Sequence, residues 1–389
     1  MSSPDVFGLL ADASARGYAP PLEVGPGVSA RLEASLPTSD GPVLVVASDR
    51  AVRSVPAVRA LIAAGAVHRG NTYPNPTTDD VIALSALVEH VRPHSIVAVG
   101  GGSTIDLAKA ARVLLPDRLS VDAGLRGEIE SMRVRPPSLI AVPTLAGTGA
   151  EVTPFATLYR NRRKVSLDVP AVRPDRAVLD GSLLLDCPPE HRVPAVLDAL
   201  CHAVESGWSR ARTPDSGRYA AAACDVILAH LATPAPHVRR TQELLAATAL
   251  AGVAIAVTRT TAAHAFSYHL TTEYGIPHGF ACAISMSWVE KHLADRRPEL
   301  RTPRVKEAVA ILRRILLAAE ADGLVDLPRL AGDRLDAYID AGLSTQSRMA
   351  GHPVQIDRDS ARLFIMGDEI LTDRRGSKLS AARLLDTRT

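Results

Sequence analysis

Four side chains that could together hold a divalent metal ion lie in the second half of the chain. Asp198 and His202 are four residues apart in a segment rich in Ala, Leu and Val, and in a helix this spacing puts both side chains on one face. The sequence predicts His264 at the end of a later helix and His278 in the turn that follows it. Three neutral imidazoles and one carboxylate suit Fe(II), Zn(II) or Mn(II), and no thiolate is required. Taken alone, Asp198 and His202 are more often a hydrogen-bonded pair on an amphipathic helix, so the metal hypothesis depends on the rest of the chain.

Two glycine-containing turns in the first half of the chain could bind phosphate. Residues 100–103, Gly-Gly-Gly-Ser, follow the short apolar run 95–99 and open a helical segment. Glycine lets a backbone approach a ligand closely and adopt positive φ, and the free N–H groups at the start of a helix attract phosphate. Residues 147–149, Gly-Thr-Gly, follow a second apolar run at 138–142. The first turn lacks the common G-x-G-x-x-G spacing and the P-loop lysine, and alone it is compatible with a plain tight turn. Two such turns at one edge of a sheet favour a dinucleotide.

An acidic residue after an earlier apolar run bears on which dinucleotide is bound. Asp49 follows residues 41–48, where a carboxylate can accept from an adenosine ribose hydroxyl. This position favours NAD, whereas Arg50 and Arg53 could contact the 2′-phosphate of NADP. The sequence therefore leaves the choice between NAD(H) and NADP(H) open.

The hydrophobic pattern divides the chain into two parts. Strand-like runs alternate with helical segments up to about residue 180, and long Ala/Leu segments follow. This predicts an α/β domain with a parallel sheet at residues 1–180 and an all-α domain at residues 181–389. Binding sites in parallel sheets lie at the carboxyl ends of the strands, where both glycine turns fall. The predicted helices span residues 77–91, 195–208, 216–231, 240–257, 304–320 and 327–343.

Composition excludes several classes of protein. The 389 residues are 47% hydrophobic and 22% charged, with a net charge of +2 and basic residues scattered among acidic ones, which argues against a nucleic-acid partner. No apolar run reaches about 18 residues and the N-terminus lacks a signal-peptide pattern, so we expect no membrane partner and a cytoplasmic location. The cysteines form no C-x-x-C pair and are expected to be reduced thiols. They are Cys187, Cys201, Cys224 and Cys282.

In this order, these motifs resemble the iron-containing, or group III metal-dependent, alcohol dehydrogenases. The resemblance covers nearly the whole chain, and its motifs are residues 100–106, residues 143–153, Asp198 with His202, and His264 with His278. It implies the dehydroquinate synthase-like fold, in which an α/β dinucleotide-binding domain and a helical domain enclose a cleft, often in a homodimer. It also implies that Asp198, His202, His264 and His278 hold the catalytic metal. The dinucleotide would be lined by Gly101, Gly102, Ser103, Asp106, Thr144, Thr148 and Lys164, with Asp49 at its adenosine ribose.

Within this family, the chain looks most like the phosphonoacetaldehyde reductases, which make 2-hydroxyethylphosphonate in phosphonate natural-product biosynthesis. The segments that carry this likeness are residues 153–156, 163–167, 205–209, 213–216, 258–268 and 274–279. A small anionic aldehyde needs a cationic partner, because an unpaired anion is costly to desolvate. Arg259, five residues before His264, is the candidate, with a surface arginine as the alternative. Phe155 and Ser267 are candidates for the pocket wall, with core packing as the alternative for Phe155.

The chain departs from the family near the expected proton donor. Many relatives have a second His four residues after the one matching His264, and here that position is Tyr268, with His269 displaced by one. One residue turns a helical side chain by about 100°, so the usual relay through His is doubtful. Tyr268 or water, acting through the nicotinamide ribose hydroxyls, could deliver the proton instead. Leu145 and Ala150 each replace a common hydroxyl-bearing residue of the cofactor turn.

Other functions remain compatible with the sequence. Sulfoacetaldehyde or an aliphatic aldehyde could be the substrate. A cyclase like dehydroquinate synthase combines NAD and a metal in a related architecture, but its substrate-binding Lys, Arg and Asn sets are not recognisable here. A non-catalytic binding protein on this fold is disfavoured because all four ligand positions are filled.

Overall fold

The computed structural model describes residues 4–70, 74–128, 132–133, 135–161, 163–232 and 237–371. The chain forms two compact units. The sheet unit comprises Phe7–Cys187 and Thr241–Ala249, and the helical unit comprises Met1–Val6, Pro188–Arg240 and Leu250–Thr389. The long second segment of the helical unit thus begins at Pro188, and two helices, α1 (Val6–Ala15) and α9 (Val238–Thr258), contribute residues to both units.

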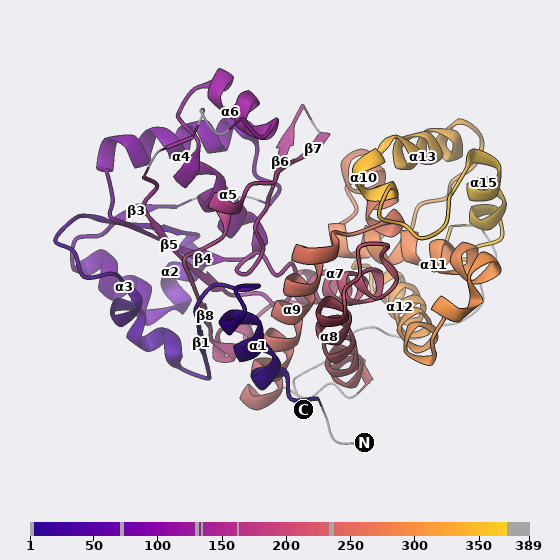
Figure 1. The fold of residues 1–389 in the computed structure, drawn as a ribbon, viewed down its shortest axis with the longest axis horizontal. Helices are drawn as coiled ribbons and strands as arrows, with labels where there is room; N and C mark the ends of the chain where they lie inside the picture. Colours follow the sequence, from indigo (N-terminus) through magenta and orange to yellow (C-terminus); the bar gives the residue numbers. More distant parts are fainter. Residues whose placement is uncertain are drawn as a thin grey trace. The chain divides into compact units, whose positions relative to one another are not determined.

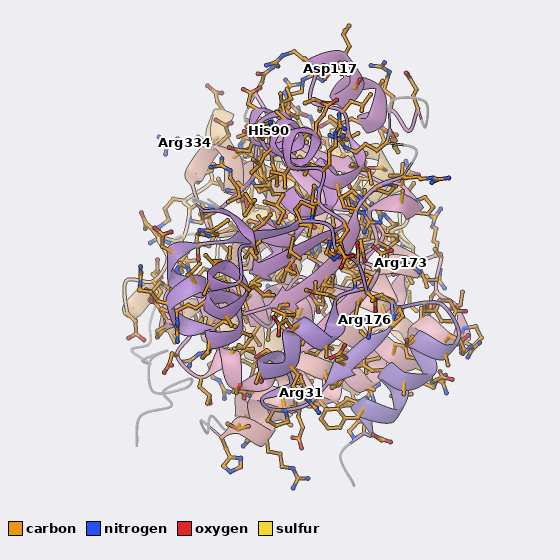
Figure 2. The ribbon with its side chains drawn as sticks, turned by 90° about the vertical axis from the view of Figure 1, so that its left-hand side faces the viewer. Arg31, His90, Asp117, Arg173, Arg176 and Arg334 are labelled. Carbon is orange, nitrogen blue, oxygen red and sulfur yellow. The ribbon has the colours of Figure 1, made fainter. Side chains whose placement is uncertain are left out.

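A six-stranded, entirely parallel sheet forms the centre of the sheet unit (Figure 1). Its strand order is β1-β8-β5-β4-β2-β3, and a separate antiparallel hairpin joins β6 and β7. The strands are β1 (Leu22–Val24), β2 (Val43–Ala47), β3 (Val67–Arg69), β4 (Ser95–Gly100), β5 (Ser138–Pro143), β6 (Ala156–Arg160), β7 (Arg163–Leu167) and β8 (Arg176–Leu179). At the sheet edge, Arg176, labelled in Figure 2, donates to the Glu23 carboxylate of β1 at 3.0 Å.

The two faces of this sheet bury alternate residues of the same strands. In β4, Ile96 and Ala98 join the core beneath α4 (Thr78–Val91) and α5 (Gly102–Val113), whereas Val97 and Val99 join the core beneath α2 (Asp49–Ser54) and α3 (Pro56–Ala63). Because a strand alternates its side chains, a strand covered on both faces must be apolar throughout. This explains the continuous apolar runs, and it confirms the predicted parallel α/β architecture.

Some helices of the sheet unit begin at a recognisable side-chain cap. The predicted helix at residues 77–91 is α4, where Thr77 and Asp80 form a capping box of the kind that satisfies free N–H groups. The helices are α1 (Val6–Ala15), α2 (Asp49–Ser54), α3 (Pro56–Ala63), α4 (Thr78–Val91), α5 (Gly102–Val113) and α6 (Arg118–Leu125), with 3₁₀ turns η1 (Val28–Ser35), η3 (Pro170–Val172) and η4 (Gly181–Leu184).

The described helices that follow residue 188 are α7 (Pro189–Trp208), α8 (Pro214–Ala232), α9 (Val238–Thr258), α10 (Ala262–Tyr274), α11 (His278–Arg296), α12 (Pro303–Ala321), α13 (Gly332–Ser344), α14 (Gln346–Met349) and α15 (Arg358–Met366), with η5 at Pro298–Leu300. Of these, α7, α8, α9, α12 and α13 correspond to the long Ala/Leu segments that the sequence predicts. Helix α7 begins six residues before the prediction because Pro189 is accommodated in its first turn. Helix α13 begins at Gly332, five residues after the predicted start at residue 327.

The predicted placement of two histidines was wrong. His264 lies in the first turn of α10 rather than at the end of a helix, and His278 is the first residue of α11 rather than part of a turn. The apolar run after His278 continues the helix, so both imidazoles sit at helix starts.

Helix α9 is the only described helix long and apolar enough to cross a membrane by length and composition. Its apolar window is 83% buried within the protein. Such burial is typical of a core helix, so α9 is weak evidence for a membrane span.

Candidate functional site

The four predicted metal ligands lie together in the helical unit. Three imidazole nitrogens surround one carboxylate oxygen, Asp198 Oδ1: His264 Nε2 at 3.3 Å, His202 Nε2 at 3.5 Å and His278 Nε2 at 3.9 Å. The rings of His202 and His264 stack with centroids 4.8 Å apart. Asp198, His202 and His264 are buried, while the His278 side chain is 24% exposed and gives the group its most open side.

This donor set fits a divalent metal ion. Ligand atoms bound tetrahedrally at about 2.1 Å from a metal lie about 3.4 Å from one another, close to the distances from Asp198 Oδ1 to His264 and His202. Burial alone raises the pKa of Asp198, but the three imidazoles reverse this and hold the pKa well below its usual range. Asp198 therefore stays ionised, as a metal ligand must. Asp198, His202, His264 and His278 stay the predicted ligands of the ion, while the described group whose ligand atoms all lie within 4.8 Å of one another comprises Asp198, His264, His278 and Cys282.

Two further residues at this centre were missed by the sequence analysis. The Cys282 sulfur lies 3.6 Å from His278 Nε2, and its ligand atom is within 4.8 Å of those of Asp198, His264 and His278. Burial raises the pKa of the Cys282 thiol. Glu205, fully buried on α7, accepts from His264 Nδ1. Their spacings, His278 plus four and His202 plus three, are the helical spacings that could have identified them.

Tyr268 and His269 lie in different surroundings, as the 100° step between them predicts. The Tyr268 ring is 6.0 Å from the His278 ring, and its hydroxyl accepts from Arg348 Nε at 3.2 Å. The ring of His269 instead lies near Tyr274 and Tyr338, at 5.9 and 6.2 Å. Of the two predicted catalytic residues, Tyr268 is the one whose ring lies near that of a predicted metal ligand, His278.

The three predicted substrate residues are placed differently from one another. Ser267 is buried and donates to the His264 carbonyl at 2.8 Å, so its hydroxyl is used within α10. Arg259 caps the end of α9 with a positive φ of 59°. Phe155 lies in the sheet unit, half-buried, and its carbonyl accepts from Lys109 at 2.9 Å. The cation beside Tyr268 is Arg348, which the sequence analysis did not single out.

The first glycine turn follows β4 and opens α5, as predicted, but it does not use positive φ. Gly101 has a φ of −77° and precedes α5, whereas positive φ occurs at Gly149 in the second turn. The first turn needs glycine for space instead: a Cβ on Gly102 would lie 2.5 Å from Thr148 Oγ1. The two turns are therefore packed directly against each other. Thr144 also donates its N–H to the Gly100 carbonyl at 3.0 Å, at the ends of the paired strands β4 and β5.

Asp106 connects α5 to the segment that enters β6. Its carboxylate accepts from the Thr157 N–H at 2.9 Å and from the fully buried Lys109 at 3.4 Å, and Lys109 also donates to Thr153 at 3.0 Å. Burial raises the pKa of Asp106, and Lys109 opposes that rise. Asp106 thus has a structural task beside any contact with a dinucleotide.

The remaining predicted cofactor residues also lie in the sheet unit. Ser103 accepts from the Asn75 N–H at 3.3 Å. Asp49 is the exposed first residue of α2, and the side chain of Arg50 donates to the Asp186 carbonyl at 2.6 Å. Lys164 lies opposite Tyr159 in the β6–β7 hairpin. Their contacts with a dinucleotide stay predictions.

Both parts of the chain, the one with the glycine turns and the one with the predicted metal ligands, match models of one protein family. Residues 20–181 match the family model for iron-containing alcohol dehydrogenase, and residues 192–326 match its C-terminal model. The chain belongs to the iron-containing alcohol dehydrogenase family, whose members use a metal ion and a nicotinamide dinucleotide.

The chain is also similar to individual enzymes of known name and structure. The chain is 37% identical to phosphonoacetaldehyde reductase from Streptomyces viridochromogenes over 67% of this chain and 69% of that protein. It is 30% identical to NADPH-dependent butanol dehydrogenase from Clostridium saccharobutylicum over 56% and 57% of the two chains. The iron-containing alcohol dehydrogenase structure from Thermotoga maritima aligns with a TM-score of 0.76 at 26% identity, covering 91% of this chain and 98% of that one. The predicted enzyme class and fold are therefore confirmed.

Proposed function

We propose that this enzyme reduces phosphonoacetaldehyde to 2-hydroxyethylphosphonate with NADH or NADPH. The reaction adds a hydride to the carbonyl carbon and a proton to its oxygen, and oxidises the nicotinamide. When bound, the divalent ion supplies Lewis acidity toward a carbonyl oxygen and the dinucleotide supplies the hydride. The 37% identity to a phosphonoacetaldehyde reductase supports this choice of aldehyde.

The main structural support for an anionic substrate is the Arg348–Tyr268 pair, which lies beside His278. Arg348 donates from Nε to Tyr268 Oη at 3.2 Å, and a guanidinium carries a fixed positive charge with N–H groups suited to an anion. The Tyr268 ring lies 6.0 Å from that of a proposed metal ligand. A phosphonate beside the metal centre would thus lie within reach of a cation, and we propose Arg348 as its partner, in place of or together with Arg259.

Tyr268 is proposed to hold the proton that the product oxygen receives. The hydroxyl accepts from Arg348, and this contact stabilises the charge that the oxygen would carry after giving up its proton. The environment of His269, between two tyrosine rings, makes it the weaker candidate.

Reduction of several aldehydes by the same metal-loaded preparation tests the proposal. Consumption of NADH and NADPH is followed at an absorbance wavelength of about 340 nm, with phosphonoacetaldehyde, sulfoacetaldehyde, butyraldehyde and acetaldehyde. A kcat/KM at least about tenfold higher for phosphonoacetaldehyde, roughly 1.4 kcal/mol of transition-state binding, is expected. If kcat/KM is instead highest for butyraldehyde, the substrate is an aliphatic aldehyde and not phosphonoacetaldehyde. The similarity to butanol dehydrogenase favours that alternative. A cytoplasmic location and a homodimer stay predictions, and light scattering tests the latter.

A further inference from the structure

Glu205 is a buried carboxylate that joins two helices of the metal centre. It lies on α7, three residues after His202, with no exposed surface. One of its oxygens, Oε1, accepts from the Thr261 N–H at 3.1 Å, the Thr261 hydroxyl at 2.7 Å and the Ala263 N–H at 2.9 Å. Thr261 precedes α10, and its own side chain makes no capping bond. Glu205 therefore caps the start of α10 from another helix.

The second oxygen of Glu205 acts on a metal ligand. Oε2 accepts from His264 Nδ1, while His264 Nε2 faces Asp198 Oδ1 at 3.3 Å. A carboxylate accepts hydrogen bonds and does not donate them, so His264 Nδ1 must carry the hydrogen. The Nε2 lone pair of a neutral His264 then faces the other ligands, which is the tautomer that binds a metal.

We infer that Glu205 is a positioning residue that sets the metal affinity of the enzyme by fixing the tautomer and orientation of His264. This inference rests on the metal centre of the proposed function. In this arrangement three residues on one face of α7 serve the centre: Asp198 and His202 as ligands, and Glu205 as the group that orients a ligand from another helix. Trp208, next along this helix, donates to the Thr261 hydroxyl at 3.0 Å and completes the buried network.

The variant Glu205→Gln separates the tautomer from the helix cap. The amide oxygen of Gln can still accept from the N–H groups of Thr261 and Ala263, but its NH₂ group would face His264 Nδ1. That nitrogen would then have to accept, which moves the hydrogen to Nε2, where the metal should bind. Metal affinity should fall about 10- to 100-fold, the range typical of such outer partners, with little change in the melting temperature of the metal-free protein.

Competition with a fluorescent chelator measures the affinity for Zn(II) and Fe(II) directly. The matched control is Glu290→Gln, which changes another buried glutamate of the helical unit, paired with Arg301, and should leave metal affinity within twofold of the wild type. Thr261→Val keeps Glu205 but removes the hydroxyl that donates to it and that accepts from Trp208, so it should lower stability without changing metal affinity.

Several results would overturn the inference. Wild-type affinity in Glu205→Gln would refute it, and so would an equal loss of affinity in Thr261→Val, because Glu205 would then only anchor α10. If Glu205→Gln does not fold, imidazole ¹⁵N shifts of the zinc-loaded wild type decide: a hydrogen on His264 Nδ1 supports the inference, and zinc on Nδ1 refutes it. A wild-type protein that binds no metal would refute the metal centre itself, a distinguishable failure.

Discussion

Gly279 is the position where a single methyl group should disrupt the metal centre. It follows His278 at the start of α11 and packs against α7. A Cβ built on Gly279 would lie 1.7 Å from the Pro194 carbonyl oxygen and 3.1 Å from the Asp198 nitrogen, whereas ordinary contact begins at 3.4 Å. Gly279→Ala therefore requires the two backbones to separate by roughly 1.7 Å, because neither obstacle is a movable side chain.

Such a displacement exceeds what a metal site tolerates. Metal–ligand distances hold to about 0.2 Å, and His278 and Asp198 come from the two helices that would separate. Overpacking of a core typically costs 1–3 kcal/mol, and we expect about 3 kcal/mol here because the clash is with backbone. For a unit of about 200 residues, this lowers the melting temperature by about 6–12 °C. Metal affinity should fall at least about 100-fold, beyond the usual effect of an outer partner.

Calorimetry of the metal-free protein and chelator competition measure these two effects. Gly207→Ala is the matched control, since Gly207 is an exposed residue of α7 and a Cβ there meets nothing within 4 Å. That change should stabilise the helix by up to about 1 kcal/mol. A Gly279→Ala protein with wild-type melting temperature and metal affinity would refute the close packing of α7 and α11.

Three further predictions concern the dinucleotide turn, the substrate and the response to pH. In Gly102→Ala the new Cβ would lie 2.5 Å from Thr148 Oγ1. Dinucleotide binding should weaken about tenfold, or about 1.4 kcal/mol, while metal affinity stays unchanged. An unchanged dinucleotide Kd in a fluorescence titration would contradict this. Arg348→Met should lower kcat/KM for phosphonoacetaldehyde about 10- to 100-fold more than for butyraldehyde, the value of a charge-assisted hydrogen bond, because both aldehydes lose the support of Tyr268 but only the phosphonate loses its cationic partner; a larger effect of Arg259→Met would favour the sequence-based candidate. Burial raises the pKa of Glu151 from 4.5 to about 7, so the protonated carboxyl favours the folded state, and its contribution is fully present below pH 4.5 and lost as pH rises through 7. The free energy of unfolding of Glu151→Gln, measured relative to the wild type, should therefore be about 3 kcal/mol higher at pH 8 than at pH 4.5. Urea unfolding at the two pH values measures it, and an equal difference at both would refute the raised pKa of Glu151.

Local sequence determined the elements and much of the site chemistry. Apolar runs such as residues 96–99, bounded by turn residues, indicated strands covered on both faces, because no polar residue alternates in them, and their order along the chain predicted the parallel sheet. Thr77 with Asp80 fixed the start of α4, as a capping box does. The residue types of Asp198, His202, His264 and His278 were sufficient to indicate a divalent metal, since the chemistry belongs to the side chains themselves.

Tertiary structure decided which side chains surround those ligands. Glu205 meets His264 and Arg348 meets Tyr268 across 59 and 80 residues of sequence, and no periodicity within one helix records such a contact. The positions of His264 and His278 at helix starts depend on Glu205 as an external cap and on Gly279 as a point of close approach, both properties of packed helices. The sequence therefore specified which groups are available, whereas the partner that orients each group is fixed only when separate helices bury their faces against one another, because that burial is non-local.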